Sequence, residues 1–222
     1  MKRKNFTLTE MLVVVVVILI LAAISSVAVI AARRKAELAN CAANQGQMGK
    51  IITAAIQNND GKLVSGNGSA DKDLWITALY KKRLVQSLEE SRCPGLMYTG
   101  NDDISDDDAR EQAYGVVVAA SGVFNFKSNK LLRDGKNSIS PANMLLGGCC
   151  AKEFKSPAAV ATLDNSNGKL IAIHSGDVVN SFFLDGSVTS LEADAFKGKS
   201  FYVPKSDGSS AEKFSGGILQ DK

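Results

Sequence analysis

Thiol and imidazole groups are the side chains of this chain best suited to metal binding or catalysis, and they are few. The 222 residues contain a single histidine, His174, and four cysteines, Cys41, Cys93, Cys149 and Cys150. No two cysteines have the Cys-x-x-Cys spacing common among zinc ligands. One imidazole without a second histidine or a cysteine partner makes a poor metal site. The pattern predicts no metal and no cofactor.

Catalytic constellations are also lacking in the sequence. A hydrogen-bonded structural role is favoured for His174 over a catalytic one, with carboxylate partners available at Asp164, Asp177 or Asp185. No serine lies in a Gly-x-Ser-x-Gly nucleophile elbow. The glycines at 66–68 and 147–148 lack the strand and helix that frame a phosphate-binding loop. We therefore expect no enzyme.

An acidic segment at 101–108, Asn-Asp-Asp-Ile-Ser-Asp-Asp-Asp, is rich in oxygen ligands. Such loops can hold Ca²⁺, but the spacing here matches no defined calcium loop. A solvated surface segment is the favoured interpretation.

The apolar residues are concentrated near the start of the chain. Residues 11–32 carry no charge, and their only polar side chains are Ser25 and Ser26. About 20 such residues suffice for an α-helix to cross a hydrocarbon core. This run is longer than the apolar core of a secretory signal peptide. A membrane-spanning helix is therefore predicted.

The net charge of +3 comes from 26 basic and 23 acidic residues. Three of the basic residues, Lys2, Arg3 and Lys4, precede the apolar run, so the rest of the chain is balanced. The basic character belongs to a membrane-proximal tip, and nucleic acid is not predicted as a partner.

The segment Phe6-Thr-Leu-Thr-Glu10, followed by Met-Leu-Val-Val, resembles the prepilin N-terminus of type IV pilins and type II secretion pseudopilins. The resemblance implies that a prepilin peptidase cuts between Asn5 and Phe6 and that the new amine is methylated. It implies that Glu10, fifth from Phe6, pairs with the amine of a neighbouring subunit. A carboxylate and an amine about 4 Å apart attract by roughly 4 kcal/mol at an effective dielectric of 20.

Asn5 departs from the family, in which a glycine usually precedes the cut. This departure favours an alternative: a permanently anchored extracytoplasmic binding module whose cleavage site has decayed. The leading hypothesis remains a non-enzymatic pilin or pseudopilin subunit, whose partners are the peptidase, other subunits and the inner membrane. The resemblance places the N-terminus inside and the domain in the periplasm or outside.

The helical pattern continues beyond the apolar run. Apolar residues recur at steps of three and four from Leu38 to Ile56, and Asn59-Asp60-Gly61 ends the pattern. We predict a leader at 1–5, a transmembrane and filament-core helix at 6–32, and its amphipathic continuation at 33–59. An extracytoplasmic globular domain follows at 60–222.

Strand signals dominate the later part of the domain. Short β-branched runs occupy 114–120 and 160–164, and a stretch near 74–85 is typical of a short helix. The clearest signal is Asp185-Gly186 between two apolar-rich runs, which predicts a hairpin with a type I′ turn. The expected fold is α+β, with the long N-terminal helix packed on an antiparallel sheet.

A second resemblance links His174 with Asp185-Gly186. Large prepilin-type families of planctomycete-like bacteria carry a histidine, nine residues and Asp-Gly; here the spacer is ten. Segments agreeing in order with those families are Asn40-Cys41-Ala-Ala-Asn44, Asn58-Asn-Asp-Gly61, Arg92-Cys93-Pro94 and Ser156-Pro157.

Cys41 lies on the helical stripe that is expected to face the domain, and Cys93 lies in a Cys-Pro turn. An oxidising compartment permits disulfides. We predict a Cys41–Cys93 disulfide and leave the state of Cys149 and Cys150 open.

Overall fold

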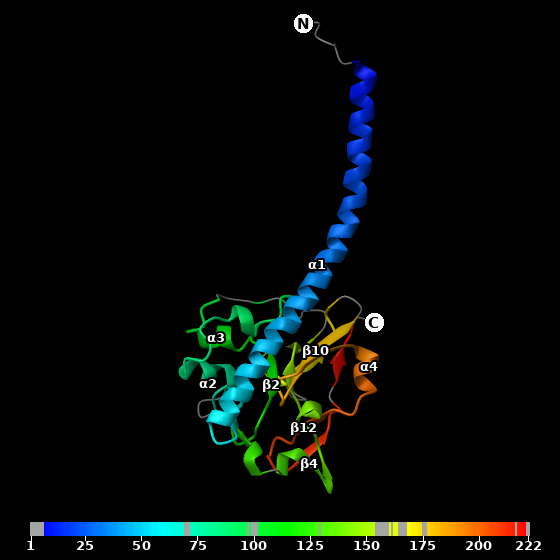
Figure 1. Cartoon of the computed structure of the whole chain (residues 1–222). Helices are drawn as coiled ribbons and strands as arrows, with labels where there is room; N and C mark the ends of the chain where they lie inside the picture. The colour runs from blue at the N-terminus through cyan, green and yellow to red at the C-terminus, as the bar shows by residue number, and fades with distance from the viewer. Residues whose placement is uncertain are drawn as a thin grey trace.

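A computed structural model of the chain describes residues 7–68, 72–96, 98, 102–128, 130–153, 160, 162–163, 168–174, 177–215 and 217–220, without the side chains of 25–27 and 128. One long helix stands out from a globular domain that packs around the helix's C-terminal half (Figure 1). Asn5, Phe6 and Asp164 lie outside the described residues.

The long helix, α1 (Leu8–Asn58), begins at a capping box. The Oγ1 atom of Thr7 accepts a hydrogen bond from the backbone N–H of Glu10, and the Thr7 N–H donates to Glu10 Oε2 at 2.8 Å. These reciprocal bonds satisfy N–H groups that have no partner within the helix. The carboxylate therefore sits at the positive end of the helix dipole.

α1 ends where the sequence predicts. The N–H of Gly61 donates to the Ile56 carbonyl at 2.8 Å, and Asp60 and Gly61 both take positive φ, at 55° and 77°. Two successive left-handed residues turn the chain away from the helix axis. The chain then enters β1 (Lys62–Val64).

The two halves of α1 have different surroundings. Every described side chain of residues 8–34 is exposed, whereas Cys41, Met48 and Ile52 are fully buried. The buried face packs on β10 (Val178–Phe183) and β11 (Val188–Glu192). The predicted amphipathic stripe is confirmed.

The main sheet has the strand order β11-β10-β6-β2-β8, where β6 is Leu145–Gly148, β2 is Gly115–Val117 and β8 is Thr162–Leu163. Its pairs are antiparallel except for β2 and β8, which run parallel. The α+β architecture is confirmed, with a mixed edge in the sheet.

Smaller units surround the main sheet. The additional strand groups are β1 with β3 (Val123–Asn125), β12 (Tyr202–Pro204) with β13 (Ala211–Lys213), β4 (Arg133–Asp134) with β5 (Asn137–Ser138), and β14 (Ile218–Leu219) with β9 (Lys169–Ile171) and β7 (Cys150–Ala151). The short helices are α2 (Trp75–Lys81), α3 (Asp107–Arg110), α4 (Ala193–Lys197), η1 (Glu89–Ser91), η2 (Phe126–Ser128), η3 (Lys130–Leu132) and η4 (Pro141–Asn143).

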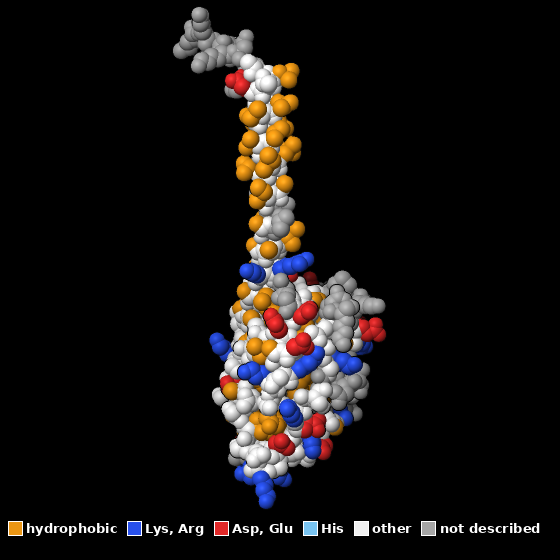
Figure 2. Space-filling model, turned by 90° about the vertical axis from the view of Figure 1, so that its right-hand side faces the viewer, with side chains coloured by type: hydrophobic (Ala, Val, Ile, Leu, Met, Phe, Trp, Pro, Cys, Tyr) orange, Lys and Arg blue, Asp and Glu red, His pale blue; other side chains and the backbone are white. Residues whose placement is uncertain are grey.

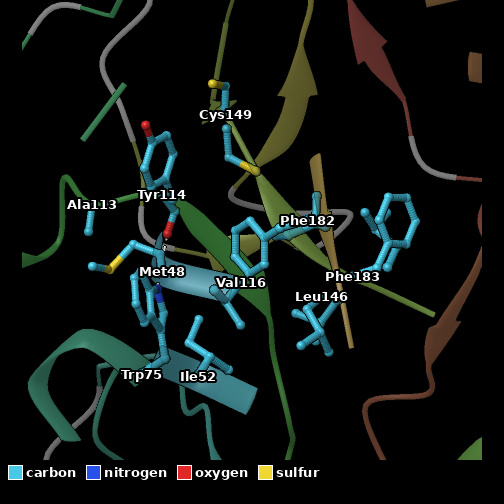
Figure 3. Close-up of a cluster of buried hydrophobic side chains, with 14 of the residues drawn as sticks. Met48, Ile52, Trp75, Ala113, Tyr114, Val116, Leu146, Cys149, Phe182 and Phe183 are labelled. Carbon is cyan, nitrogen blue, oxygen red and sulfur yellow. Dashed lines mark hydrogen bonds between the residues drawn. The ribbon is translucent and has the colours of Figure 1, made fainter. Parts of the chain in front are cut away.

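The core lies between α1 and the main sheet. Met48 and Ile52 from α1, Trp75 from α2, and Val116 and Phe182 from the sheet share one interior (Figure 3). The indole N–H of Trp75 donates to the Tyr114 carbonyl at 3.0 Å. Its one polar atom is thereby satisfied inside the core.

The hairpin of β10 and β11 forms as predicted, but its turn differs. Gly186 has φ of 81°, whereas Asp185 is not among the residues with positive φ. The Gly186 N–H donates to the Phe183 carbonyl and the Phe183 N–H donates to the Ser187 carbonyl. The predicted type I′ turn is therefore wrong, because it needs positive φ at both central residues. A three-residue loop with a glycine bulge explains the pattern.

Candidate functional site

The helix tip holds Glu10, the residue to which the resemblance to prepilins assigns a role in assembly. In the single chain its carboxylate is exposed, and Oε2 accepts hydrogen bonds from both the N–H and the Oγ1 of Thr7. Its pairing with a neighbouring amine stays a prediction. The geometry gives the carboxylate a local partner in the unassembled chain.

Asp185 and Gly186 form the tip of the hairpin that crosses α1. The Asp185 Oδ1 atom accepts hydrogen bonds from the N–H and Oγ of Ser187, at 2.9 and 2.6 Å. A Cβ placed on Gly49 of α1 would lie 3.4 Å from the Gly186 oxygen, and Thr53 Oγ1 donates to the Leu184 carbonyl at 3.1 Å. Asp185-Gly186 thus shapes a docking contact between the hairpin and α1.

His174 lies at the other end of β10, where it forms an isolated bridge with Val178. Its Nε2 atom is 3.4 Å from Cys93 Sγ and 3.8 Å from Cys149 Sγ. Among the described residues no carboxylate joins this group. The expectation that His174 lacks a cysteine partner is wrong, because the fold brings thiols to its ring.

Three thiols and this imidazole form one cluster, which we call the Cys3His cluster: Cys41, Cys93, Cys149 and His174. Cys41 comes from α1, Cys93 from the turn after η1, Cys149 from the junction of β6 and β7, and His174 from the segment after β9. The four ligand atoms all lie within 4.8 Å of one another. These residue types can ligate a metal.

The cluster is enclosed by protein. The exposed fractions are 0% for Cys41 and Cys149, 1% for Cys93 and 5% for His174. Burial raises the pKa of the Cys93 and Cys149 thiols. Burial also acts to raise the pKa of Cys41, but hydrogen bonds from Cys149, Cys93 and His174 outweigh it and lower that pKa.

Polar groups surround the sulfurs. The side-chain N–H of fully buried Gln45 points to Cys149 Sγ at 3.2 Å and to Cys41 Sγ at 3.6 Å. The Tyr114 hydroxyl lies 3.7 Å from Cys41 Sγ, and the Gly95 backbone N–H hydrogen-bonds the Cys93 sulfur. Sequence reasoning missed Gln45: its partner Cys41 lies one helical turn away, but Cys149 and Asn180 lie 104 and 135 residues away and are brought to it only by the fold.

The Cys41–Cys93 disulfide stays a prediction. Their sulfurs lie 3.6 Å apart, and Cys149 is closer to Cys41, at 3.2 Å. A disulfide requires about 2.05 Å between its sulfurs. The fold thus brings the predicted pair together and adds a third thiol that sequence spacing did not reveal.

The described part of the acidic segment forms ion pairs and a helix cap within the domain. Asp102 pairs with Arg92, Asp107 pairs with Arg110, and Asp106 caps α3 by accepting from the N–H groups of Asp108 and Ala109. These carboxylates serve as arginine partners and helix caps.

Residues 2–26 match the family model of the prokaryotic N-terminal methylation motif. No curated protein and no solved structure matches the chain significantly. Over the described residues, α1 is long and apolar enough to cross a membrane. The motif supports a prepilin-type family, and with the apolar helix it fits a type IV pilin or pseudopilin held by a single-pass inner-membrane anchor.

The same motif points to a structural subunit rather than an enzyme, and it implies processing by a prepilin peptidase. The finer resemblance to the planctomycete-like families stays a prediction.

Proposed function

We propose that the chain is a type IV pilin-like or pseudopilin subunit that assembles through the N-terminal half of α1 into a filament or a secretion pseudopilus. The observation that carries the proposal is an apolar helix surface that the chain's own domain leaves uncovered (Figure 2). Leu8 is 84% exposed and Ile24 is 67% exposed. An exposed apolar surface of this extent needs lipid or protein around it.

The length of this surface suits a helix that spans the membrane before assembly and packs in a helical bundle after assembly. Residues 8–32 extend for about 37 Å at 1.5 Å per residue, slightly more than a hydrocarbon core of about 30 Å. The apolar residues face all sides of the helix, as lipid requires. Helices leaving the membrane together could bury the same side chains against one another.

A basic boundary supports this division of α1. Arg33, Arg34 and Lys35 are all exposed on α1, and Lys and Arg side chains lie where the helix meets the domain (Figure 2). Long basic side chains keep their charges at a membrane interface while their stems cover apolar surface. We therefore assign 1–5 to a leader, 6–32 to the membrane and filament core, 33–59 to the docked continuation, and 60–222 to an extracytoplasmic domain.

Glu10 is proposed to set the register between subunits. A carboxylate at the membrane centre costs about 2.5–3.5 kcal/mol on insertion scales and less near the interface. Attraction to the Phe6 amine of a neighbour, roughly 4 kcal/mol at 4 Å and a dielectric of 20, offsets that cost. Cleavage between Asn5 and Phe6 by the prepilin peptidase supplies the amine.

The test separates assembly from anchoring. Glu10→Val removes the charge and favours simple membrane insertion, so the variant should reach the inner membrane yet form no sheared or secreted filaments. Glu10→Gln keeps the shape and should also fail. Thr9→Val, one residue away, is the matched control and should assemble. Normal filaments from the Glu10→Val strain would reject the role of the carboxylate.

A further inference from the structure

The geometry points to a structural zinc site, with Cys41, Cys93, Cys149 and His174 as the four ligands. This assignment goes beyond the proposed filament role and does not depend on it. The zinc assignment replaces the expectation that the chain holds no metal, which rested on the spacing of the cysteines and the single histidine along the sequence. Here the ligands are far apart in the sequence and are brought together only by the fold.

Four of the six distances between donor atoms in the Cys3His cluster are close to those of a tetrahedral metal centre, and no two donor atoms are more than 4.8 Å apart. With zinc–sulfur bonds of 2.3 Å and zinc–nitrogen bonds of 2.0–2.1 Å, a tetrahedron has sulfur–sulfur edges of about 3.8 Å and sulfur–nitrogen edges of about 3.6 Å. The observed edges are 3.6 and 3.2 Å between sulfurs, and 3.4 and 3.8 Å from His174 Nε2 to sulfur. All four donor atoms can thus reach one ion.

The donor set selects the metal. Three thiolates and one imidazole are soft ligands, so they favour zinc over calcium or magnesium, which take oxygen ligands. All four side chains are at most 5% exposed, and a buried four-ligand site leaves no open position for substrate. The site would therefore be structural rather than catalytic.

The surrounding donors fit thiolate ligands. Three thiolates with Zn²⁺ leave one net negative charge on the site. The buried Gln45 amide, the Gly95 backbone N–H and the Tyr114 hydroxyl all approach the sulfurs and can share that charge. Groups that hydrogen-bond to metal ligands orient them and strengthen binding.

A disulfide accounts for less of the geometry. It would use two of the three sulfurs and leave the third beside an imidazole whose Nε2 faces two sulfurs. Buried cysteines can also serve simply as small apolar residues, but that role does not explain why His174 joins them. One metal ion engages all four groups at once.

The zinc would join the filament helix to its domain. Cys41 belongs to α1. The other three ligands belong to the domain: Cys93 to the turn after η1, Cys149 to the junction of β6 and β7, and His174 to the segment after β9. The ion would fix the docked half of α1 at its upper end, seven residues before Met48 enters the core. Folding of the domain around α1 would depend on metal.

The first test measures metal in the full-length protein, purified in detergent under anaerobic conditions without chelators. Wild type should carry about one zinc ion per chain. Cys41→Ser and His174→Ala should lose it, while His174→Cys, which supplies a fourth thiolate, should retain it. Cys150→Ala is the matched control, since Cys150 is 1% exposed and adjacent to Cys149 but outside the cluster.

A second measurement does not rely on ligand variants that may not accumulate. Chelation of wild type should lower the melting temperature reported by Trp75 fluorescence, and Zn²⁺ should restore it. Co²⁺ added to the stripped protein should give the thiolate charge-transfer and visible bands of a tetrahedral site. Gln45→Leu should weaken zinc binding about 10–100-fold.

The inference fails if wild type from zinc-replete cells carries no zinc and binds no cobalt. Zinc bound equally by Cys41→Ser would also overturn it. Peptide mapping that finds a Cys41–Cys93 disulfide would overturn it as well and confirm the disulfide prediction.

Discussion

The two halves of α1 can be tested by the same truncation at two sites. Ile52 is 0% exposed and lies near Trp75 and Val116 between α1 and the sheet (Figure 3). Truncating a fully buried isoleucine to alanine costs about 2–5 kcal/mol. One kcal/mol shifts the melting temperature of a domain of this size by about 2–4 °C. Ile52→Ala should therefore melt about 4–20 °C below wild type.

Ile20→Ala is the matched control on the same helix. Ile20 is 55% exposed and touches lipid or neighbouring subunits in the proposed assembly. Its truncation should change the free energy of unfolding of the domain by no more than about 0.5 kcal/mol. It should instead weaken filament assembly, because the lost methyl groups belong to packing between subunits.

The assay is thermal unfolding of the detergent-solubilised chain, followed by the fluorescence of Trp75, the single tryptophan. Trp75 is 1% exposed and sits in the interior that Ile52 fills, so its emission reports the domain and not the membrane helix. Equal melting temperatures for Ile52→Ala and wild type would refute the docking of α1. A large drop for Ile20→Ala would refute the division of the helix into two halves.

Three further predictions concern helix packing, at Gly46 and Gly49, and processing, at Asn5. Gly46→Ala should stabilise the chain by about 0.5–1 kcal/mol through helix propensity, since the added Cβ meets Val188 at an ordinary 3.7 Å. Gly49→Leu should destabilise by about 1–3 kcal/mol, because the Gly186 turn already lies 3.4 Å from the Cβ position; equal melting temperatures would contradict this reasoning. Asn5→Gly should raise the processed fraction of the chain, because glycine lets a peptidase approach the backbone, and Asn5→Leu should abolish processing. Immunoblots that show the same processed fraction in all three strains would rule out a role for this position.

Local patterns predicted α1, α2, β2 and the hairpin of β10 and β11, but no strand was predicted at β6 (Leu145–Gly148), the central strand of the main sheet, and no helix at α3 or α4. The run of apolar residues and the stripe from Leu38 to Ile56 gave α1 to within about two residues, because periodicity is a local property. The predicted strand at 114–120 corresponds to β2 (Gly115–Val117), and the apolar-rich run before Asp185-Gly186 corresponds to β10 (Val178–Phe183). The glycine turn between β10 and β11 was found, although its type depends on the φ of Asp185, which Asp-Gly alone does not decide.

The Cys3His cluster was not predicted from the sequence, because its four residues are far apart in the chain. The separations are 52 residues between Cys41 and Cys93 and 108 between Cys41 and Cys149. His174 lies 81 residues from Cys93. A usable signal existed in Cys41, since a cysteine on the buried face of a helix must meet the domain. The topology of β6, β7 and β9 decides which groups it meets.

The mature N-terminus tests the pilin-like assignment most directly. Mass spectrometry of the chain isolated from cell envelopes identifies its first residue and any methyl group on the amine. Cleavage gives Glu10 the partner that the assembly requires, so the chain should begin at Phe6 with a methylated amine. A chain that retains residues 1–5 would contradict the account and favour a permanently anchored extracytoplasmic binding module.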